Sequence, residues 1–282
     1  MAVYKRSYRA YQGSYTPEWS RFLIISRYAS RAKLATWVFI VCLFPSLITA
    51  LLIYLNHNVS LLSYLRTSRP PFEIGAQFFA NFLRVQLGLA FVLTAFLGPG
   101  LVSPDLSNNA LVMYLCRPLT RTEYVLGKSF VLARDLSLIT WIPGLLLFLI
   151  EADLSGWQWT SENWYIARAI VLSSFIAIVT LSLLALALSA WVKWRPVAGG
   201  LVLGFIFLSA GFGAAVNGIM RTDAGDLISV PRLLSNITRS LFQLSEPSDA
   251  LAPWHHWTAL FCFAGLCLFL LSRKLKAYEV VR

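Results

Sequence analysis

The chain has 282 residues, of which 57% are hydrophobic, 14% aromatic and 13% charged, and its mean hydropathy is +0.65. Soluble domains carry about 25% charged residues, so this composition excludes a water-soluble globule, and its apolar content excludes a disordered chain. The net charge of +11 comes from 24 Lys and Arg against 13 Asp and Glu. In so apolar a chain we ascribe the excess to basic cytoplasmic loops and not to nucleic-acid binding.

The first 33 residues are polar and basic, and residues 17–33 predict an amphipathic helix that lies on the membrane. Pro17 suits the first helical position. Apolar side chains gather on one face of this segment, while Arg21, Arg27 and Arg31 gather on the other, which is typical of a helix facing anionic headgroups. The alternative is a solvated segment beside the membrane.

Six apolar segments approach the length of about 20 residues that a membrane-spanning helix needs. None shows the period-2 alternation of a barrel strand. We therefore predict an all-α integral membrane protein with six transmembrane helices, forming one domain over residues 34–272. The predicted spans are residues 34–55, 85–102 (with 78 as an earlier start), 129–150, 169–191, 197–219 and 254–271.

These spans hold few ionisable residues away from their ends. Arg134 and Asp135 fall in the first turns of the third span, where we expect them to reach the inner surface or to pair with each other. Because intramembrane charge usually marks ion or proton relays, its scarcity argues against an ion-coupled transporter and against a membrane hydrolase.

The basic residues predict the orientation. With a cytoplasmic N-terminus, 17 of the 24 Lys and Arg fall on the inner side, including the basic tail at residues 273–282. Cytoplasmic loops carry such an excess. We therefore expect a multi-pass protein of the cell (inner) membrane with both termini in the cytoplasm.

The loop between the second and third spans, residues 103–128, predicts a short cytoplasmic helix. Ser103 suits an N-cap and Pro104 a first helical position, and Pro118 favours an end near Cys116. An amphipathic helix parallel to the membrane suits docking into a groove of a soluble partner. The alternative is a simple loop that covers the end of the bundle.

This loop resembles the coupling region of the permease subunits of type 2 ATP-binding cassette (ABC) exporters. Those carry an acidic residue, Leu-like residues, a Pro–hydroxyl–Arg group, an aromatic or aliphatic pair, and Gly-Lys before the third span. The matching positions here are Asp105, Leu111, Leu115, Pro118, Thr120, Arg121, Tyr124, Val125, Gly127 and Lys128. The chain departs from the pattern at residues 108–110, which read Asn-Asn-Ala where the family often has Gly-Thr.

The resemblance also covers the six spans, the N-terminal helix and the long fifth loop. It implies a permease that forms the translocation pathway with a second copy or a paralogue, and that docks on a separate cytoplasmic ATPase subunit. ATP and Mg would be bound by that partner, and this chain would hold no cofactor and no catalytic site. The docking residues implied are Asp105, Leu106, Leu111, Met113, Tyr114, Arg117, Pro118, Arg121, Glu123 and Lys128.

Other motifs predict no site in this chain. Gly127-Lys128-Ser129 lacks the earlier glycine of a phosphate-binding loop, since that position is Thr122. No CxxC or Cys/His cluster favours a metal, and adjacent His255 and His256 point in different directions on a helix.

The last loop, residues 220–253, carries apolar residues at helical spacing. In the exporters it resembles, this region dips into the outer leaflet. An amphipathic helix resting on the outer surface is the alternative. Two other functions also stay open, namely a non-transporting membrane anchor for a cytoplasmic ATPase complex and a lipid-modifying membrane enzyme.

Overall fold

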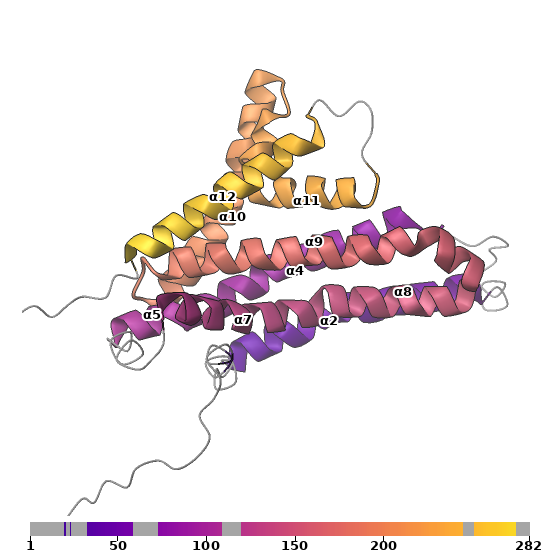
Figure 1. The fold of residues 1–282 in the computed structure, drawn as a ribbon, viewed down its shortest axis with the longest axis horizontal. Coiled ribbons are helices and arrows are strands. Elements are labelled where there is room, and N and C mark those ends of the chain that lie inside the picture. Colours follow the sequence, from indigo (N-terminus) through magenta and orange to yellow (C-terminus); the bar gives the residue numbers. More distant parts are fainter. Residues whose placement is uncertain are drawn as a thin grey trace, which may run out of the picture.

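The computed structural model describes residues 33–58, 73–108, 120–244 and 251–274, together with Ser20 and Leu23. Every regular element in these residues is a helix (Figure 1). The helices are α2 (Lys33–His57), α4 (Ala76–Leu97), α5 (Pro99–Ser107), α7 (Arg121–Ile139), α8 (Trp141–Ser155), α9 (Trp157–Ser189), α10 (Arg195–Met220), η2 (Ala224–Leu227), α11 (Val230–Leu241) and α12 (Pro253–Lys274).

Within the described residues, six helical stretches are long and apolar enough to cross a membrane, which confirms the predicted all-α class and the six predicted apolar segments for this part of the chain. They are α2, α4 continued by α5, α7 continued by α8, α9, α10 and α12. The amphipathic helix predicted for residues 17–33 lies outside the described residues, except for Ser20, Leu23 and Lys33.

Helix α9 is the centre of the bundle and contacts α4, α5, α7, α8, α10, α11 and α12. Many of its buried residues are small, such as Ser173, Ala177, Ser182 and Ala185. Small side chains let neighbouring helices approach closely, which is how helices associate where water supplies no driving force.

Two spans are interrupted where the sequence predicts continuous helices. At Gly98, between α4 and α5, a Cβ would lie 2.6 Å from the Cβ of Ala185, so only glycine allows this approach to α9. Between α7 and α8 the backbone breaks at Thr140 (φ −107°, ψ −92°). Pro143 has no N–H to offer the carbonyl of Ile139, which explains the break.

The predicted start of the loop helix at Pro104 is wrong. Helix α5 begins at Pro99, and Pro104 lies inside it. Ser103 is fully buried within the helix and does not cap it. Pro99 and Pro104 both suit the first position of a helix. The contacts of Ser103 with α9 favour the start at Pro99.

The second span also begins earlier than its main prediction. Helix α4 starts at Ala76, close to the alternative start at residue 78. Arg84, which the positive-inside count treats as a loop residue, is therefore the ninth residue of a spanning helix. A charged residue lowers the local hydropathy, so the predicted span starts only after Arg84.

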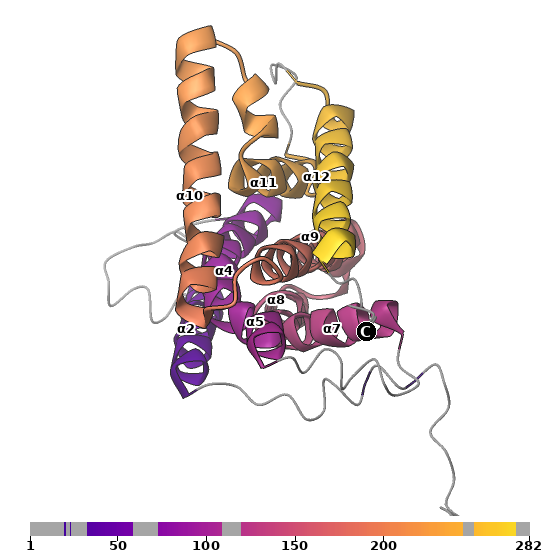
Figure 2. The same ribbon diagram turned by 90° about the vertical axis from the view of Figure 1, so that its left-hand side faces the viewer.

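Helices α10 and α12 stand at a steep angle to the other spans, as the two views show together (Figures 1 and 2). Helix α11 lies between them, beside α9, and contacts both as well as α4 and α9. Its apolar face, Val230, Leu233, Leu234 and Ile237, is buried there. The helical spacing predicted in this loop is confirmed over Val230–Leu241, and the helix packs among the long apolar helices.

The outward faces of α2, α10 and α12 are apolar. Large side chains such as Phe44, Leu47, Phe207, Leu208 and Phe261 are exposed on them. A soluble monomer rarely exposes patches of this extent, whereas a hydrocarbon surrounding accepts them. The exposed tryptophans gather near helix ends, as in the aromatic belts of membrane proteins; they include Trp37, Trp157, Trp191, Trp194 and Trp254.

Candidate functional site

The predicted docking residues fall on both sides of the limit of the described residues. Leu111, Met113, Tyr114, Arg117 and Pro118 lie outside them. Their docking role stays a prediction.

Leu106 lies in α5 and Arg121 is the first residue of α7. Asp105, Glu123 and Lys128 are the three predicted docking residues whose contacts can be given. All three bond to residues of this chain, at the two stems of the loop.

The two stems are joined by a cluster of three side chains. The Oδ2 atom of Asp105, on α5, accepts a hydrogen bond from the hydroxyl of Tyr124 at 2.7 Å and lies 2.7 Å from Nζ of Lys128. Both partners lie on α7, four residues apart, and so face the same side of that helix. The Asp105 and Lys128 side chains are only 15% and 10% exposed, so the carboxylate is paired inside the protein.

Glu123 closes the N-terminus of α7. Its Oε2 atom accepts from the backbone N–H of Thr120 at 2.6 Å and from the Thr120 hydroxyl at 2.9 Å. The hydroxyl in turn accepts from the N–H of Glu123 at 3.2 Å. This reciprocal capping box sets where α7 begins.

The other stem is bound to α9. The backbone N–H of Ser103 donates to Oγ of Ser189 at 3.2 Å. The Ser103 hydroxyl donates to the carbonyl oxygen of Ser189 at 3.1 Å. Both serines are fully buried. Helices α5, α7 and α9 therefore meet at the base of the loop through two sets of buried polar contacts.

We call these two sets of contacts the clamp: Asp105 with Tyr124 and Lys128, and Ser103 with Ser189. The sequence predicts only part of it. The i,i+4 spacing of Tyr124 and Lys128 was a readable signal for one helical face. Asp105 lies 19 residues before Tyr124, and Ser189 lies 86 residues after Ser103. No local pattern links residues at these separations.

A second cluster joins α2 to α8. Nε2 of His57 lies 3.1 Å and 3.2 Å from the two carboxylate oxygens of Glu151, and the Ser155 hydroxyl donates to Glu151. A hydrolytic relay needs the nucleophile and the carboxylate on opposite imidazole nitrogens. Here Ser155 and Glu151 both approach Nε2, so the arrangement fits an inter-helix tie better than a catalytic triad.

A third cluster lies at η2. Asp226 accepts hydrogen bonds from Asn217 of α10 at 2.8 Å, and from Arg232 at 2.8 Å and Asn236 at 3.2 Å of α11. Burial opposes ionisation of this carboxyl, but the hydrogen bonds from Arg232, Asn236 and Asn217 and the charge of Arg232 outweigh it. The pKa of Asp226 is therefore held below its usual value.

The backbone of η2 presses on α10 at the same place. A Cβ on Gly213 would collide with the carbonyl oxygen of Gly225, and a Cβ on Gly225 would collide with that of Gly213. Two glycines are thus needed for the close approach that brings Asp226 to its partners.

The buried charge in the third span is paired, as one of the two expectations had it. Nε of Arg134 donates to Oδ1 of Asp135 at 3.1 Å, and Asp135 is fully buried. Glu151, which follows the predicted end of the third span at residue 150, is also buried. This span therefore carries more charge than the sequence predicts.

No group of three or more His, Cys, Asp or Glu side chains in the described ranges is placed to hold a metal ion. His255 and His256 contact different groups: Nδ1 of His255 lies 3.1 Å from the carbonyl oxygen of Ala252, and Nε2 of His256 lies 3.2 Å from Nδ2 of Asn236.

No family model matches this chain, and no curated protein matches it.

Proposed function

We propose that this chain is the permease subunit of an ATP-driven exporter of the ABC type 2 class, and that its loop after α5 couples a separate ATPase subunit to the transmembrane helices. ATP and Mg would be held by the ATPase subunit. A second copy or a paralogue would complete the pathway. The fold class and the resemblance of the loop both support this assignment.

The observation that carries the proposal is the clamp at the base of the loop. Asp105 ties α5 to Lys128 and Tyr124 of α7, while Ser103 ties α5 to Ser189 of α9. A displacement of the loop would therefore move the inner ends of three spans together. Coupling requires such a link, because a loop on independent stems would absorb the movement of its partner.

The remaining features fit the same proposal. The charge distribution supports cytoplasmic termini in the inner membrane, and residues 17–33 would lie on the cytoplasmic surface as an interfacial helix. Helix α11 packs beside the middle of α9, which supports a segment that re-enters the bundle in preference to one resting on its surface. In this role α11 would close the outer end of the pathway.

Co-purification with an ATPase tests the proposal. The tagged full chain, gently extracted from native membranes, is expected to bring down a protein with a Walker motif. Leu111→Asp and Arg121→Glu should each reduce this association at least tenfold without affecting membrane insertion. Reconstitution with the captured ATPase should then raise its ATP hydrolysis.

Lys193→Glu is the matched control, because Lys193 is an exposed cation on the same predicted side but outside the loop. It should leave association unchanged. Capture of the ATPase by both loop variants as well as by the unmodified chain would refute the coupling role. Association without any effect on ATP hydrolysis would instead identify a membrane anchor.

A further inference from the structure

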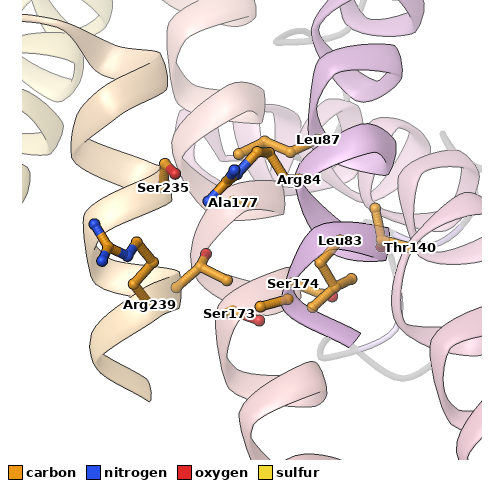
Figure 3. Close-up of a pocket in the computed structure, with 11 residues that line it drawn as sticks. Leu83, Arg84, Leu87, Thr140, Ser173, Ser174, Ala177, Ser235 and Arg239 are labelled. Atoms are coloured by element: carbon orange, nitrogen blue, oxygen red, sulfur yellow. The ribbon is translucent and has the colours of Figure 1, made fainter. Parts of the chain in front are cut away.

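A hollow opens between α4, α9 and α11, away from the base of the loop (Figure 3). It is small, with a cavity volume of about 20 Å³, and it opens to the surroundings. Ser174, which lines it, is the eighteenth of the 33 residues of α9, roughly 25 Å along that helix. The hollow therefore lies deep beside the central spanning helix.

Two arginines line this hollow. Arg84 comes from α4 and extends toward α11, which contributes Arg239 (Figure 3). Arg84 is exposed and Arg239 is half-buried. Across the part of the chain that the structure describes, neither guanidinium forms an ion pair or hydrogen bond, and the residues lining the hollow include no Asp or Glu.

The hollow also offers an unused buried hydroxyl. Ser174 is 3% exposed, and its Oγ has no hydrogen-bond partner among the residues that the structure describes. By contrast, the hydroxyl of the neighbouring Ser173 donates to the carbonyl oxygen of Ala169 at 2.6 Å. A buried hydroxyl without a hydrogen-bond partner is unfavourable, and a bound acceptor would satisfy it.

The rest of the lining is apolar. Leu83 and Leu87 of α4 face the hollow together with Ala177 of α9. A cation in the apolar part of a spanning helix is unfavourable unless it is paired. A small hydrated anion would leave this apolar wall unfilled, whereas a molecule with an anionic end and an apolar body satisfies both parts.

We propose that the hollow binds a membrane amphiphile through its anionic headgroup. A phosphate or carboxylate lies between Arg84 and Arg239 and accepts from Ser174, since guanidinium pairs bind such groups through several charge-assisted hydrogen bonds. The apolar chain of the amphiphile lies along Leu83 and Leu87. This assignment rests on the hollow alone and does not depend on ATPase docking.

Native mass spectrometry of the purified full chain tests the site. The protein in an uncharged detergent is offered equal amounts of phosphatidylglycerol and phosphatidylcholine. The unmodified chain should retain phosphatidylglycerol in at least tenfold preference. The Arg84→Gln/Arg239→Gln variant should retain the two lipids equally. Since neither guanidinium pairs with a residue in the described ranges, this variant should fold, as its unfolding temperature would verify.

Arg168→Gln/Arg221→Gln is the matched control. It removes the same charge at two exposed positions that do not line the hollow, and it should keep the preference. Equal losses in both double variants would show a general charge effect and overturn the proposal. Added inorganic phosphate gives a further comparison. If it displaces the bound lipid as effectively as added phosphatidylglycerol does, the site binds the anion alone. That result also overturns the amphiphile proposal.

Discussion

Removing Lys128 tests whether the clamp between α5 and α7 is a structural unit. In Lys128→Met, the Asp105 carboxylate keeps, among the described residues, its hydrogen bond from Tyr124. Loss of one partner of a buried ion pair is destabilising by about 3–5 kcal/mol. Because the Asp105 side chain is still 15% exposed and retains the tyrosine, we expect the lower end, about 3 kcal/mol.

Thermal unfolding of the full chain in detergent measures this effect. A loss of about 3 kcal/mol corresponds to a fall in Tm of roughly 6–12 °C for a domain of this size class. Lys193→Met is the control, because that lysine is exposed, and it should shift Tm by less than about 1 °C.

The double variant Asp105→Asn/Lys128→Met separates the ion pair from simple loss of packing. With both charges gone, no unpaired ion remains buried, so the double variant should be more stable than the sum of the two single changes predicts. If Lys128→Met unfolds at the same temperature as Lys193→Met, the clamp contributes nothing and the reasoning from its geometry is refuted.

Three further predictions concern other parts of the bundle. Gly213→Ala should lower Tm, because the new Cβ collides with the backbone of η2. Gly218→Ala on the same helix places its Cβ where nothing lies within 4 Å, so it should leave Tm unchanged. Equal changes in Tm for the two variants would contradict the close approach at Gly213. Asp226 has a depressed pKa, so its stabilisation is present above the ordinary value of 3.8 and is lost as the pH falls through the lower folded value. The Tm difference between the unmodified chain and Asp226→Asn should thus be large at pH 7 and vanish in strong acid; a difference that does not change with pH would refute it. Gln86 is fully buried, and neither its amide oxygen nor its amide nitrogen has a hydrogen-bond partner among the described residues. Gln86→Leu should therefore stabilise the chain by about 1–2 kcal/mol, whereas Gln77→Leu at an exposed position should not. A lower Tm for Gln86→Leu would show that the amide has a partner.

The six spans could be predicted because hydropathy is a local property. A run of about 20 apolar residues has few alternatives to a spanning helix. Predicted and observed boundaries differ mainly at charged residues, as at Arg84. The breaks at Gly98 and Thr140 escaped notice, since glycine, threonine and proline are also frequent within continuous membrane helices.

The start of α5 shows how two equal local signals are resolved. Both Pro99 and Pro104 suit a first helical position. Ser103 would be a good N-cap in isolation, but its bonds to Ser189 hold it inside the helix. A contact across 86 residues therefore overrides a local preference.

The candidate sites divide in the same way. The loop motif identified Asp105, Tyr124 and Lys128 as positions of interest, but their mutual pairing required the fold. The hollow beside Arg84 and Arg239 had no sequence signal, because its two arginines come from α4 and α11 and were both counted as loop residues.

By itself the sequence predicted the all-helical class and the six long apolar segments, since these depend on residues adjacent in the chain; the loop on which a partner would act stays a prediction. The tertiary structure decided which charges pair, where α11 packs and which arginines pair with nothing in the described part of the chain. The reason is physical: hydropathy sums over neighbours in sequence, whereas an ion pair or a hydrogen bond acts only over a few ångströms in space. Only the packed bundle brings such residues within that range.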